Sequence, residues 1–339
     1  MKTIILKIDP NKPQKKIIKK AAEIIRKNGL AAFPTETVYG LGCSALSRTA
    51  ALKVFAAKNR PPDNPLIVHL ADVKDIPSIA YADQKKLELI KQLSPGPVTF
   101  LLRKRKIIPD EITAGSPKVA VRIPSHPTAL ALIRESGVPI AAPSANLSTK
   151  PSPTRAAHVI EDLRGKIDLI LDGGRTNYGI ESTIIDLTSK VPTVLRLGSF
   201  DIEELKKYFP NLKILKKTKT KVPGTQYKHY APLTPMISVE RKVLGKKVSQ
   251  LSKQYKICVL CSRETGEKIK LKGIKKIILG SQKNLKEIAH NLFSCFRKLD
   301  KSGADLGIVE RFEEKGAGLA LMNRIQKAAQ KTAQCFQRG

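Results

Sequence analysis

The chain has 339 residues, long enough for two domains with separate cores, and a formal net charge of +33 at pH 7. No apolar run approaches the roughly 18 residues that cross a bilayer, and the short apolar start is not a signal peptide, so we expect a cytoplasmic protein. Five cysteines scattered among mostly apolar neighbours fit a reducing compartment better than a disulfide framework.

The positive charge is uneven along the chain. Residues 1–210 carry +13 and residues 211–339 carry +20, although the second part is shorter. Such a field attracts polyanions such as RNA. The alternative is a lysine-rich composition spread over solvated faces. Aromatic residues make up only 5% and Trp is absent, so the sequence offers little for stacking on bases.

The first 210 residues alternate strand and helix signals. Residues 3–8 alternate as a strand does, residues 14–27 have helical spacing and end at Asn28-Gly29, and Ser47 can cap a helix that runs to about Lys58. A strand ends at Phe33. Further strands are expected at 66–70, 98–102, 119–123, 139–142, 169–171, 183–187 and 194–197, and further helices at 84–93, 128–135, 154–163 and 202–208. This alternation predicts an α/β domain with a large sheet.

Residues 212–235 are lysine-rich and contain several prolines, which predicts an extended linker between a domain at 1–211 and a second one at 236–339. The second domain alternates again. Its strands are expected at 236–239, 257–260, 277–279 and 305–309, and its helices at 243–254, 284–299 and 317–332. We therefore expect a small, mostly parallel sheet.

The stretch FPTETVYGLG, starting at Phe33, is the first candidate site. A strand that stops at a proline and is followed by Thr35, Glu36, Thr37 and Tyr39 often places a ligand at the strand's end. The alternative is an ordinary turn with local side-chain to backbone bonds.

Lys58 and Arg60 precede a rigid elbow, PPDNP, that feeds the strand containing His69. Cations held at such an elbow can grip a triphosphate, and arginine offers a fork to phosphate oxygens. The alternative is that they complement a helix dipole on a solvated face. A lone strand histidine is more often a core residue than a ligand contact.

Two more groups lie in or after strands. Arg122 interrupts an apolar run, so a buried guanidinium there needs an anionic partner, either a substrate carboxylate or an internal Asp or Glu. Ser144 and Asn146, in PSANLS, follow a strand and can hold phosphate oxygens or metal-bound water, or form an ordinary loop. Ser152 could equally be a helix cap.

Other chemistries lack support. Cys258 and Cys261 resemble half a zinc site, but their odd spacing in a strand sends them to opposite faces and no second pair follows. GxGxxG and Walker motifs are absent, and no Ser/His/Asp or Cys/His set stands out. The remaining chemistry is electrostatic, with cations, hydroxyls and Mg²⁺ around phosphates.

The chain resembles the YrdC-like family of threonylcarbamoyl-AMP synthases in its long two-domain form. The resemblance rests on FPTETVYGLG, KNRPPDNPLIVH, SPGPVTFLL, KVAVRIPSHP, PSANLS, ESTIIDL and VLRLGS, in the family's order, and on PGTQYKHYAPLTP, NLFSCFRKLD and GAGLALMNRIQKAA beyond them. It implies a large twisted mixed sheet with helices, followed by a smaller Rossmann-like parallel α/β domain.

The resemblance also implies an activity. L-threonine, bicarbonate or CO₂ and ATP, with Mg²⁺, would give threonylcarbamoyl-adenylate and pyrophosphate, and a downstream transferase complex would use the product to modify an adenosine of ANN-decoding tRNAs. Positioning would carry most of the rate, because the carbamate oxygen itself attacks the α-phosphate.

The family's functional residues map onto this chain in two groups. By resemblance, the threonine pocket would be lined by Thr37, His69, Arg122, Ala142 and Ser182. ATP and its metal would be surrounded by Lys58, Arg60, Asn64, Lys118, Ser144, Asn146, Ser152 and Arg196, with Tyr230 as part of a lid; Lys58 and Arg60 would be catalytic, and no residue is assigned as a direct metal ligand. Lys118 departs from the family, which more often has a small hydroxyl residue there.

Two other functions remain to be weighed. An RNA-binding or ribosome-maturation factor would explain the charge and would bind RNA with a steep salt dependence, but it would not require the ordered polar motifs. Carbamoyl transfer, as in hydrogenase-maturation proteins with a YrdC-like domain, would be accompanied by cysteine clusters that this chain lacks.

Overall fold

A computed structural model describes residues 1–215, 222–223 and 231–329. The chain forms two compact units. The first comprises 1–148, 152–177 and 181–227, and the second comprises 149–151, 178–180 and 228–339. Each unit is described by itself.

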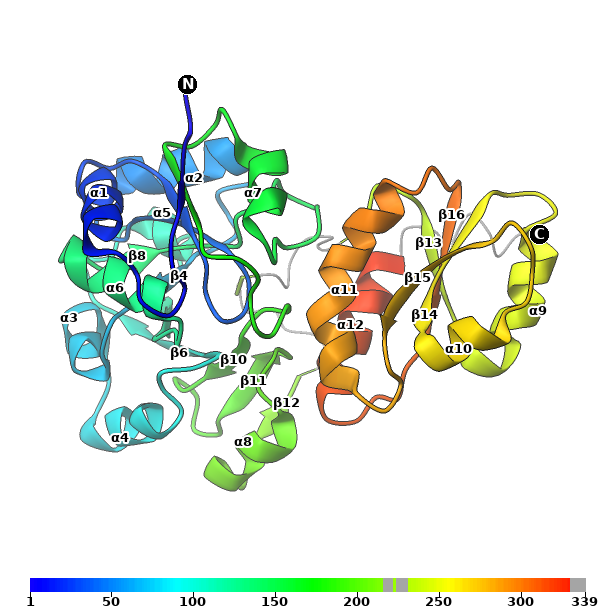
Figure 1. Cartoon of the computed structure of the whole chain (residues 1–339). Coiled ribbons are helices and arrows are strands. Elements are labelled where there is room, and N and C mark those ends of the chain that lie inside the picture. The colour runs from blue at the N-terminus through cyan, green and yellow to red at the C-terminus, as the bar shows by residue number, and fades with distance from the viewer. Residues whose placement is uncertain (216–221, 224–230, 330–339) are drawn as a thin grey trace. The chain divides into compact units, whose positions relative to one another are not determined.

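The first unit contains one large sheet with helices around it (Figure 1). Its strands are β1 (Ile4–Lys7), β2 (Ala31–Phe33), β3 (Gly40–Ser44), β4 (Ile67–His69), β5 (Ala80–Tyr81), β6 (Val98–Lys104), β7 (Lys118–Arg122), β8 (Ile140–Ala141), β9 (Leu169–Asp172), β10 (Thr183–Asp186), β11 (Thr193–Arg196) and β12 (Lys213–Ile214). Its helices are α1 (Lys15–Arg26), α2 (Arg48–Lys58), η1 (Val73–Asp75), α3 (Ile76–Ile79), α4 (Gln84–Gln92), α5 (Asp110–Thr113), α6 (Pro127–Ser136), α7 (Ala156–Leu163) and α8 (Ile202–Tyr208).

The sheet is mixed, as the sequence predicted. Its strand order is β1-β9-β2-β3-β8-β4-β7-β6-β10-β11-β12, with β5 paired to β6. Neighbours such as β4 and β7 run parallel, whereas β2 and β3, β4 and β8, and β6 and β7 run antiparallel. The predicted elements agree closely with the observed ones, but β3 and the short elements β5, η1, α3 and α5 were not predicted, and Lys213 and Ile214 join the sheet through β11 instead of lying in a linker.

Helices α1 and α6 cover one part of this sheet, where Figure 1 shows them beside each other. Ile18 and Ile25 of α1 and Leu132 of α6 pack with Phe33 and Ile140 in one buried cluster. Each such side chain contributes roughly 1.5–3 kcal/mol when fully buried. The cluster therefore fixes the ends of β2 and β8, from which candidate site residues follow.

Helix α2 begins and ends as its sequence dictates. The Ser47 hydroxyl accepts a hydrogen bond from the amide of Ala50, which confirms the predicted cap. The helix ends at Asn59, whose φ of 49° lies in the left-handed region that asparagine tolerates. This reversal turns the chain directly after Lys58 and before Arg60.

The second unit holds a four-stranded sheet in the order β13-β16-β14-β15, and all of its pairs are parallel. The strands are β13 (Met236–Val239), β14 (Ile257–Ser262), β15 (Lys275–Gly280) and β16 (Leu306–Glu310), and the helices are α9 (Arg241–Leu251), α10 (Arg263–Lys268), α11 (Leu285–Asp300) and α12 (Ala317–Ala329). The prediction of a small parallel α/β sheet is confirmed; only α10 was missed.

Cys258 and Cys261 both lie buried in β14, and burial raises the pKa of the Cys261 thiol to about 12. Among the residues that the structure describes, no group of three His, Cys, Asp or Glu side chains could hold a metal ion. None of the helices in the same residues is long and apolar enough to span a membrane.

Gly198 follows β11 and lies against the peptide between Ser182 and Thr183. A Cβ atom on it would lie 2.2 Å from the Ser182 carbonyl carbon and 2.3 Å from the Thr183 nitrogen. We expect Gly198→Ala to lower the free energy of unfolding of the first unit by about 3 kcal/mol, because backbone cannot move aside as a side chain can. Urea unfolding followed by circular dichroism measures it.

Gly245→Ala is the matched control for this substitution. Gly245 lies inside α9, and an added Cβ there would meet no atom within 4 Å other than the neighbouring backbone of its own helix. Alanine should therefore leave stability unchanged or raise it by up to about 1 kcal/mol through helix propensity. Equal effects of the two substitutions would contradict the steric explanation.

Candidate active site

Strand ends bring several candidate residues together. His69, at the end of β4, is in register with Arg122, at the end of the parallel strand β7, and with Ile140 of β8. The amide of Ala142 donates to the carbonyl oxygen of Ile67 at 2.8 Å. Residues far apart in sequence thus meet where ligands collect in open α/β sheets.

Arg122 is buried and paired with an internal carboxylate. Its Nη2 donates to Glu36 Oε1 at 2.6 Å and its Nε donates to the Gly96 carbonyl oxygen at 3.3 Å, while the two side chains are 4% and 3% exposed. The internal partner that we weighed for Arg122 is therefore present. This partner, Glu36, lies in the turn Thr35-Glu36-Thr37 after β2. The sequence had assigned it no specific role.

The rest of that turn is rigidly bonded. The Thr35 hydroxyl donates to the Val38 carbonyl oxygen at 2.6 Å and lies 2.9 Å from the Thr37 hydroxyl. The Tyr39 hydroxyl donates to the Gly174 carbonyl oxygen at 2.7 Å. Thr37 is fully buried beside these groups. The local bonds of an ordinary turn are thus all present, and they hold Thr37 in a fixed place.

His69 is a buried, neutral imidazole at neutral pH. Burial, and then the positive charge of Arg122, lower the pKa of His69 to about 3. Its Nδ1 lies 3.1 Å from the Ile67 carbonyl oxygen, and backbone hydrogen bonds to Ile67 and Ile140 oppose part of the lowering of its pKa.

Lys58 is fully buried at the end of α2. Its Nζ donates to the main-chain carbonyl oxygens of Ser144 and Asn146, which ties α2 to the PSANLS loop. Burial lowers the pKa of Lys58 well below its ordinary value; the charge of Arg60 adds to this and that of Asp162 opposes it. The lysine and the loop that the sequence assigned to phosphate thus form one cluster.

Arg60 organises the proline-rich elbow. Its Nη2 donates to the carbonyl oxygens of Asn64 and Pro65 at 3.0 and 2.9 Å, and the side chain is buried. Asn64 is buried in the same elbow. These contacts fix the guanidinium next to Lys58, whose pKa senses its charge.

A third group surrounds the start of β10. Nη2 of Arg196 donates to the Ser182 hydroxyl at 3.0 Å and to the Ser182 carbonyl oxygen at 2.8 Å, and Nη1 donates to the Pro223 carbonyl oxygen at 2.9 Å. The Ser152 hydroxyl donates to Glu181 Oε1 at 2.6 Å, so Ser152 is not a helix cap. All of these side chains are buried.

One predicted site residue lies apart from these groups. Lys118 begins β7, at the opposite end from Arg122, and its Nζ pairs with Asp186 Oδ2 at 2.9 Å. Along a strand of this length, Lys118 and Arg122 are separated by roughly 13 Å. Tyr230 lies outside the described residues.

His126 was not singled out from the sequence, although it stands in the KVAVRIPSHP motif. It is buried, and its Nδ1 accepts a hydrogen bond from the Thr128 amide at the start of α6. Burial lowers the pKa of His126, and the nearby charge of Glu36 opposes the shift. The residue four positions after Arg122 thus lies beside the ion pair, which local sequence could not indicate.

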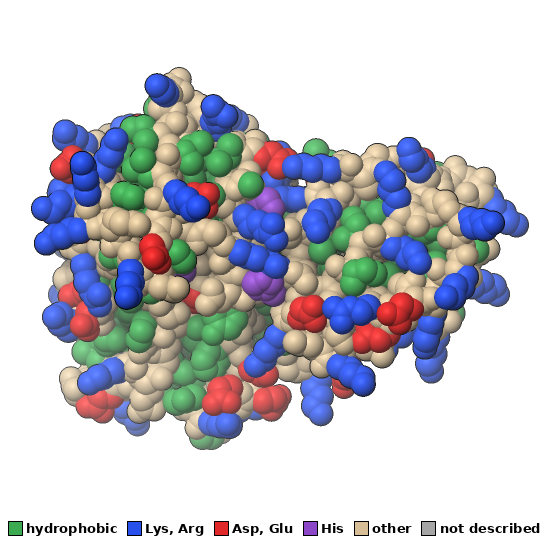
Figure 2. All heavy atoms as spheres, viewed as in Figure 1, with side chains coloured by type: hydrophobic (Ala, Val, Ile, Leu, Met, Phe, Trp, Pro, Cys, Tyr) green, Lys and Arg blue, Asp and Glu red, His purple; other side chains and the backbone are tan. Residues whose placement is uncertain are grey.

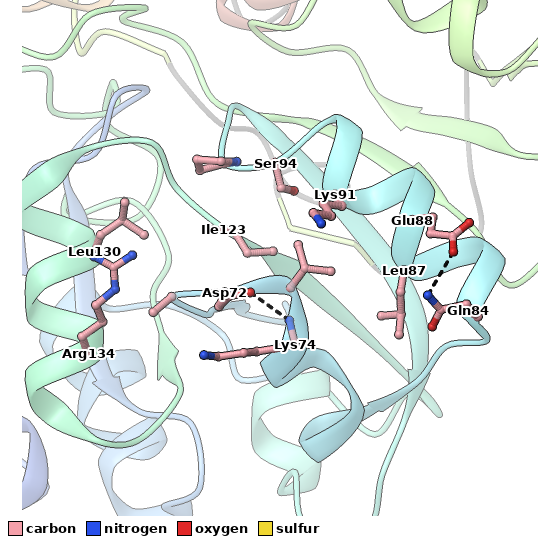
Figure 3. A pocket seen from close by; sticks show the side chains of 13 residues that line it. Asp72, Lys74, Gln84, Leu87, Glu88, Lys91, Ser94, Ile123, Leu130 and Arg134 are labelled. Carbon is pink, nitrogen blue, oxygen red and sulfur yellow. Dashed lines mark hydrogen bonds between the residues drawn. The ribbon is translucent and has the colours of Figure 1, made fainter.

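A separate cavity of about 510 Å³ has Ile123, the residue after Arg122, in its wall (Figure 3). It is lined from η1, α4 and α6, and Ser94 and Ile123 belong to its wall. Its charged residues are mixed: Asp72, Lys74, Glu88, Lys91 and Arg134. Since it contains none of the candidate site residues and no single sign of charge, we do not assign it to the reaction.

The surface in view carries many basic side chains interspersed with acidic ones and not gathered into one patch (Figure 2). This is the pattern expected from lysines on solvated faces. Among the described residues, this face shows no localised basic groove of the kind that a nucleic-acid site would have.

Fold and site together define an α/β protein in which buried cations and small hydroxyl side chains gather near the ends of strands and of helix α2. The Sua5, YciO and YrdC family model, described as "Telomere recombination", matches residues 23–198, and the model "Threonylcarbamoyl-AMP synthase, C-terminal domain" matches residues 200–330. The chain belongs to the Sua5/YrdC family of threonylcarbamoyl-AMP synthases.

Individual relatives match over nearly the whole chain. The threonylcarbamoyl-AMP synthase of Pyrococcus abyssi is 44% identical over 92% of this chain and 94% of its own length, and that of Bacillus subtilis is 40% identical over 95% and 94%. The crystal structure of P. abyssi Sua5 complexed with L-threonine has a TM-score of 0.90 and 41% identity, covering 97% of this chain and 98% of that one.

The lowered pKa of His69 predicts a pH dependence. An unfolded histidine titrates near 6.5, so the neutral folded imidazole contributes stability that is fully present above that pH and is lost as the pH falls toward about 3. We expect the wild type to lose about 1 kcal/mol more stability than His69→Gln between about pH 7 and about pH 5.5. Urea unfolding at both pH values measures the difference, and parallel losses would contradict the burial of a neutral imidazole.

Proposed function

We propose that the chain is an L-threonylcarbamoyladenylate synthase, a nucleotidyltransferase that makes threonylcarbamoyl-AMP and pyrophosphate from L-threonine, bicarbonate or CO₂, and ATP. The observation that supports this most is the match, at a TM-score of 0.90 over 97% of the chain, to P. abyssi Sua5, which was crystallised with L-threonine. The product would serve N6-threonylcarbamoylation of ANN-decoding tRNAs through a downstream transferase complex.

In this proposal threonine binds at the ends of β4, β7 and β8. Arg122 receives the carboxylate, and Thr37, His69, Ala142 and Ser182 line the rest of the pocket. The register of His69 with Arg122 and the bonded position of Thr37 support this grouping. The neutral state of His69 suits a site that must not repel a threonine ammonium group.

ATP binds, in the same proposal, around the Lys58 cluster. Lys58, Arg60 and Arg196 supply positive charge, and Asn64, Ser144, Asn146 and Ser152 supply hydrogen bonds. The contact between Lys58 and the PSANLS loop supports one continuous phosphate site. Lys118 would be reached only by a distant part of the nucleotide, and Tyr230 would act as a lid.

The chemistry needs positioning more than a protein nucleophile. The threonine amine adds to CO₂ and loses a proton to give a carbamate, whose oxygen attacks the α-phosphorus while pyrophosphate leaves. Buried cations stabilise the charge that develops on phosphate oxygens, and holding the reactants together removes most of the entropic cost.

Mg²⁺ fits this donor set as an ion that enters with ATP. Hydroxyl and amide oxygens such as those of Ser144 and Asn146 suit it, and magnesium commonly binds through substrate phosphates while keeping several waters. When bound, it would neutralise charge on the leaving pyrophosphate.

We further propose that the enzyme works in the cytoplasm, and that its basic surface meets RNA only through weak, salt-sensitive contacts. An RNA-binding or ribosome-maturation role as the main function would leave the buried polar clusters unexplained. The dispersed basic side chains in Figure 2 also give no support for RNA binding as the main function.

Pyrophosphate release tests the proposed reaction. We expect release with threonine, bicarbonate and ATP together, and less than about a tenth of it when threonine is omitted, because threonine supplies the attacking group. EDTA should abolish release and added Mg²⁺ should restore it. Equal release without threonine would refute the function.

Arg122→Lys tests the carboxylate role. The lysine keeps a charge beside Glu36 but loses the guanidinium fork, so we expect the KM for threonine to rise about 10-fold or more and the KM for ATP to change less than about 2-fold. Arg134→Lys, in the cavity of Figure 3, is the matched control. Equal effects on the two substrates would argue against carboxylate binding.

A further inference from the structure

Among the residues that the structure describes, Glu36 uses one of its two carboxylate oxygens. Oε1 accepts the hydrogen bond from Arg122 Nη2 at 2.6 Å, whereas Oε2 is buried and has no hydrogen-bond partner among the described residues. The main-chain oxygen of Glu36 accepts from the Asn177 amide at 3.0 Å, so the residue is held in place. A fixed, buried, charged acceptor is thus available.

An oxygen of this kind is costly to leave unbonded. A buried polar atom without a partner costs roughly 1–3 kcal/mol, and more when it is charged. Arg122 also has one nitrogen without a hydrogen bond. Its Nε and Nη2 donate hydrogen bonds, whereas its Nη1 makes none to the described residues. The buried pair therefore keeps both an acceptor and a donor beyond its own hydrogen bond.

We propose that Glu36 and Arg122 together bind the zwitterionic head of an α-amino acid, with Glu36 Oε2 accepting from its ammonium group and Arg122 Nη1 donating to its carboxylate. Ammonium and carboxylate are attached to the same carbon of an α-amino acid, so they form a short dipole. An ion pair with one oxygen and one nitrogen to spare presents the complementary dipole. The inference rests on the proposed function, which makes threonine the substrate.

The neighbouring groups do not supply another anionic acceptor. The Thr35 hydroxyl is uncharged and already accepts from the amides of Thr37 and Val38. His69 and His126 are buried imidazoles with lowered pKa values. Of the groups described around Arg122, Glu36 is the one that can match a positive charge, which makes it a specificity-determining residue for the amine.

A competing arrangement predicts the opposite effect. If the substrate carboxylate displaced Glu36 from Arg122, Glu36 would be a competitor, and neutralising it would strengthen threonine binding. In the proposed arrangement Glu36 remains bonded to Arg122 and neutralising it weakens binding. The sign of the change separates the two.

Calorimetric titration of the full chain with L-threonine and with 3-hydroxybutanoate, which is threonine without its amine, tests the proposal. Glu36→Gln keeps an oxygen for Arg122 but loses the charge. We expect the Kd for threonine to rise about 10- to 100-fold, as for loss of a buried charge-assisted hydrogen bond, and the Kd for 3-hydroxybutanoate to change less than about 3-fold. Glu111→Gln, which removes a surface ion pair with Arg48, is the matched control and should change neither.

Three results would overturn the proposal. Equal weakening of both ligands would mean that Glu36 acts only through Arg122, and tighter threonine binding would mean that it competes with substrate. Should Glu36→Gln fail to fold, the wild type alone decides: equal affinity for threonine and 3-hydroxybutanoate excludes an ammonium contact. A wild type that binds no threonine would instead refute the proposed function itself, which keeps the two failures distinct.

Discussion

The buried ion pair between Arg122 and Glu36 constrains how the first unit must be built. Its two residues are 86 positions apart and end up 2.6 Å from each other. In the sheet, β3, β8 and β4 lie between β2, which leads to Glu36, and β7, which carries Arg122. The turn after β2 must therefore extend over the ends of these strands. Because removing one member of a buried pair leaves an uncompensated charge, this turn and the strand ends below it are fixed together.

Most of the fold could be read from local sequence because its elements are short, apolar and bounded by proline and glycine. The strand β3 was missed for a physical reason. Gly40 and Gly42 carry no side chains that would mark a strand, yet a Cβ on Gly42 would lie 2.7 Å from the Phe33 ring. Tertiary packing required glycine there and removed the strand signal. Likewise, the lysines after Leu212 suggested only repulsion, although two residues pair with β11.

For the site, too, local sequence predicted some features and missed those that depend on tertiary contacts. Residue type and position at the end of a helix or strand were enough to nominate Lys58, Arg122 and Asn146, whereas His69 was nominated by the family motifs. Which group faces which was not accessible, because partners such as Glu36 and Arg122, or Ser152 and Glu181, come from different parts of the chain. His126 illustrates the limit: nothing near it in sequence distinguishes it from a helix-capping residue, which it also is. Lys118 shows that a matching motif position can still face an internal partner.

Lys58 would link the proposed nucleotide site to the pH of the solution. Its ammonium group lies where burial disfavours charge, bonded to two main-chain carbonyl oxygens. An arriving polyphosphate favours that charge, so phosphate binding and protonation of Lys58 reinforce each other thermodynamically. At a pH where Lys58 of the free enzyme is partly neutral, the heat of nucleotide binding would then include proton uptake from the buffer, and its apparent value would follow the ionisation enthalpy of whichever buffer is chosen.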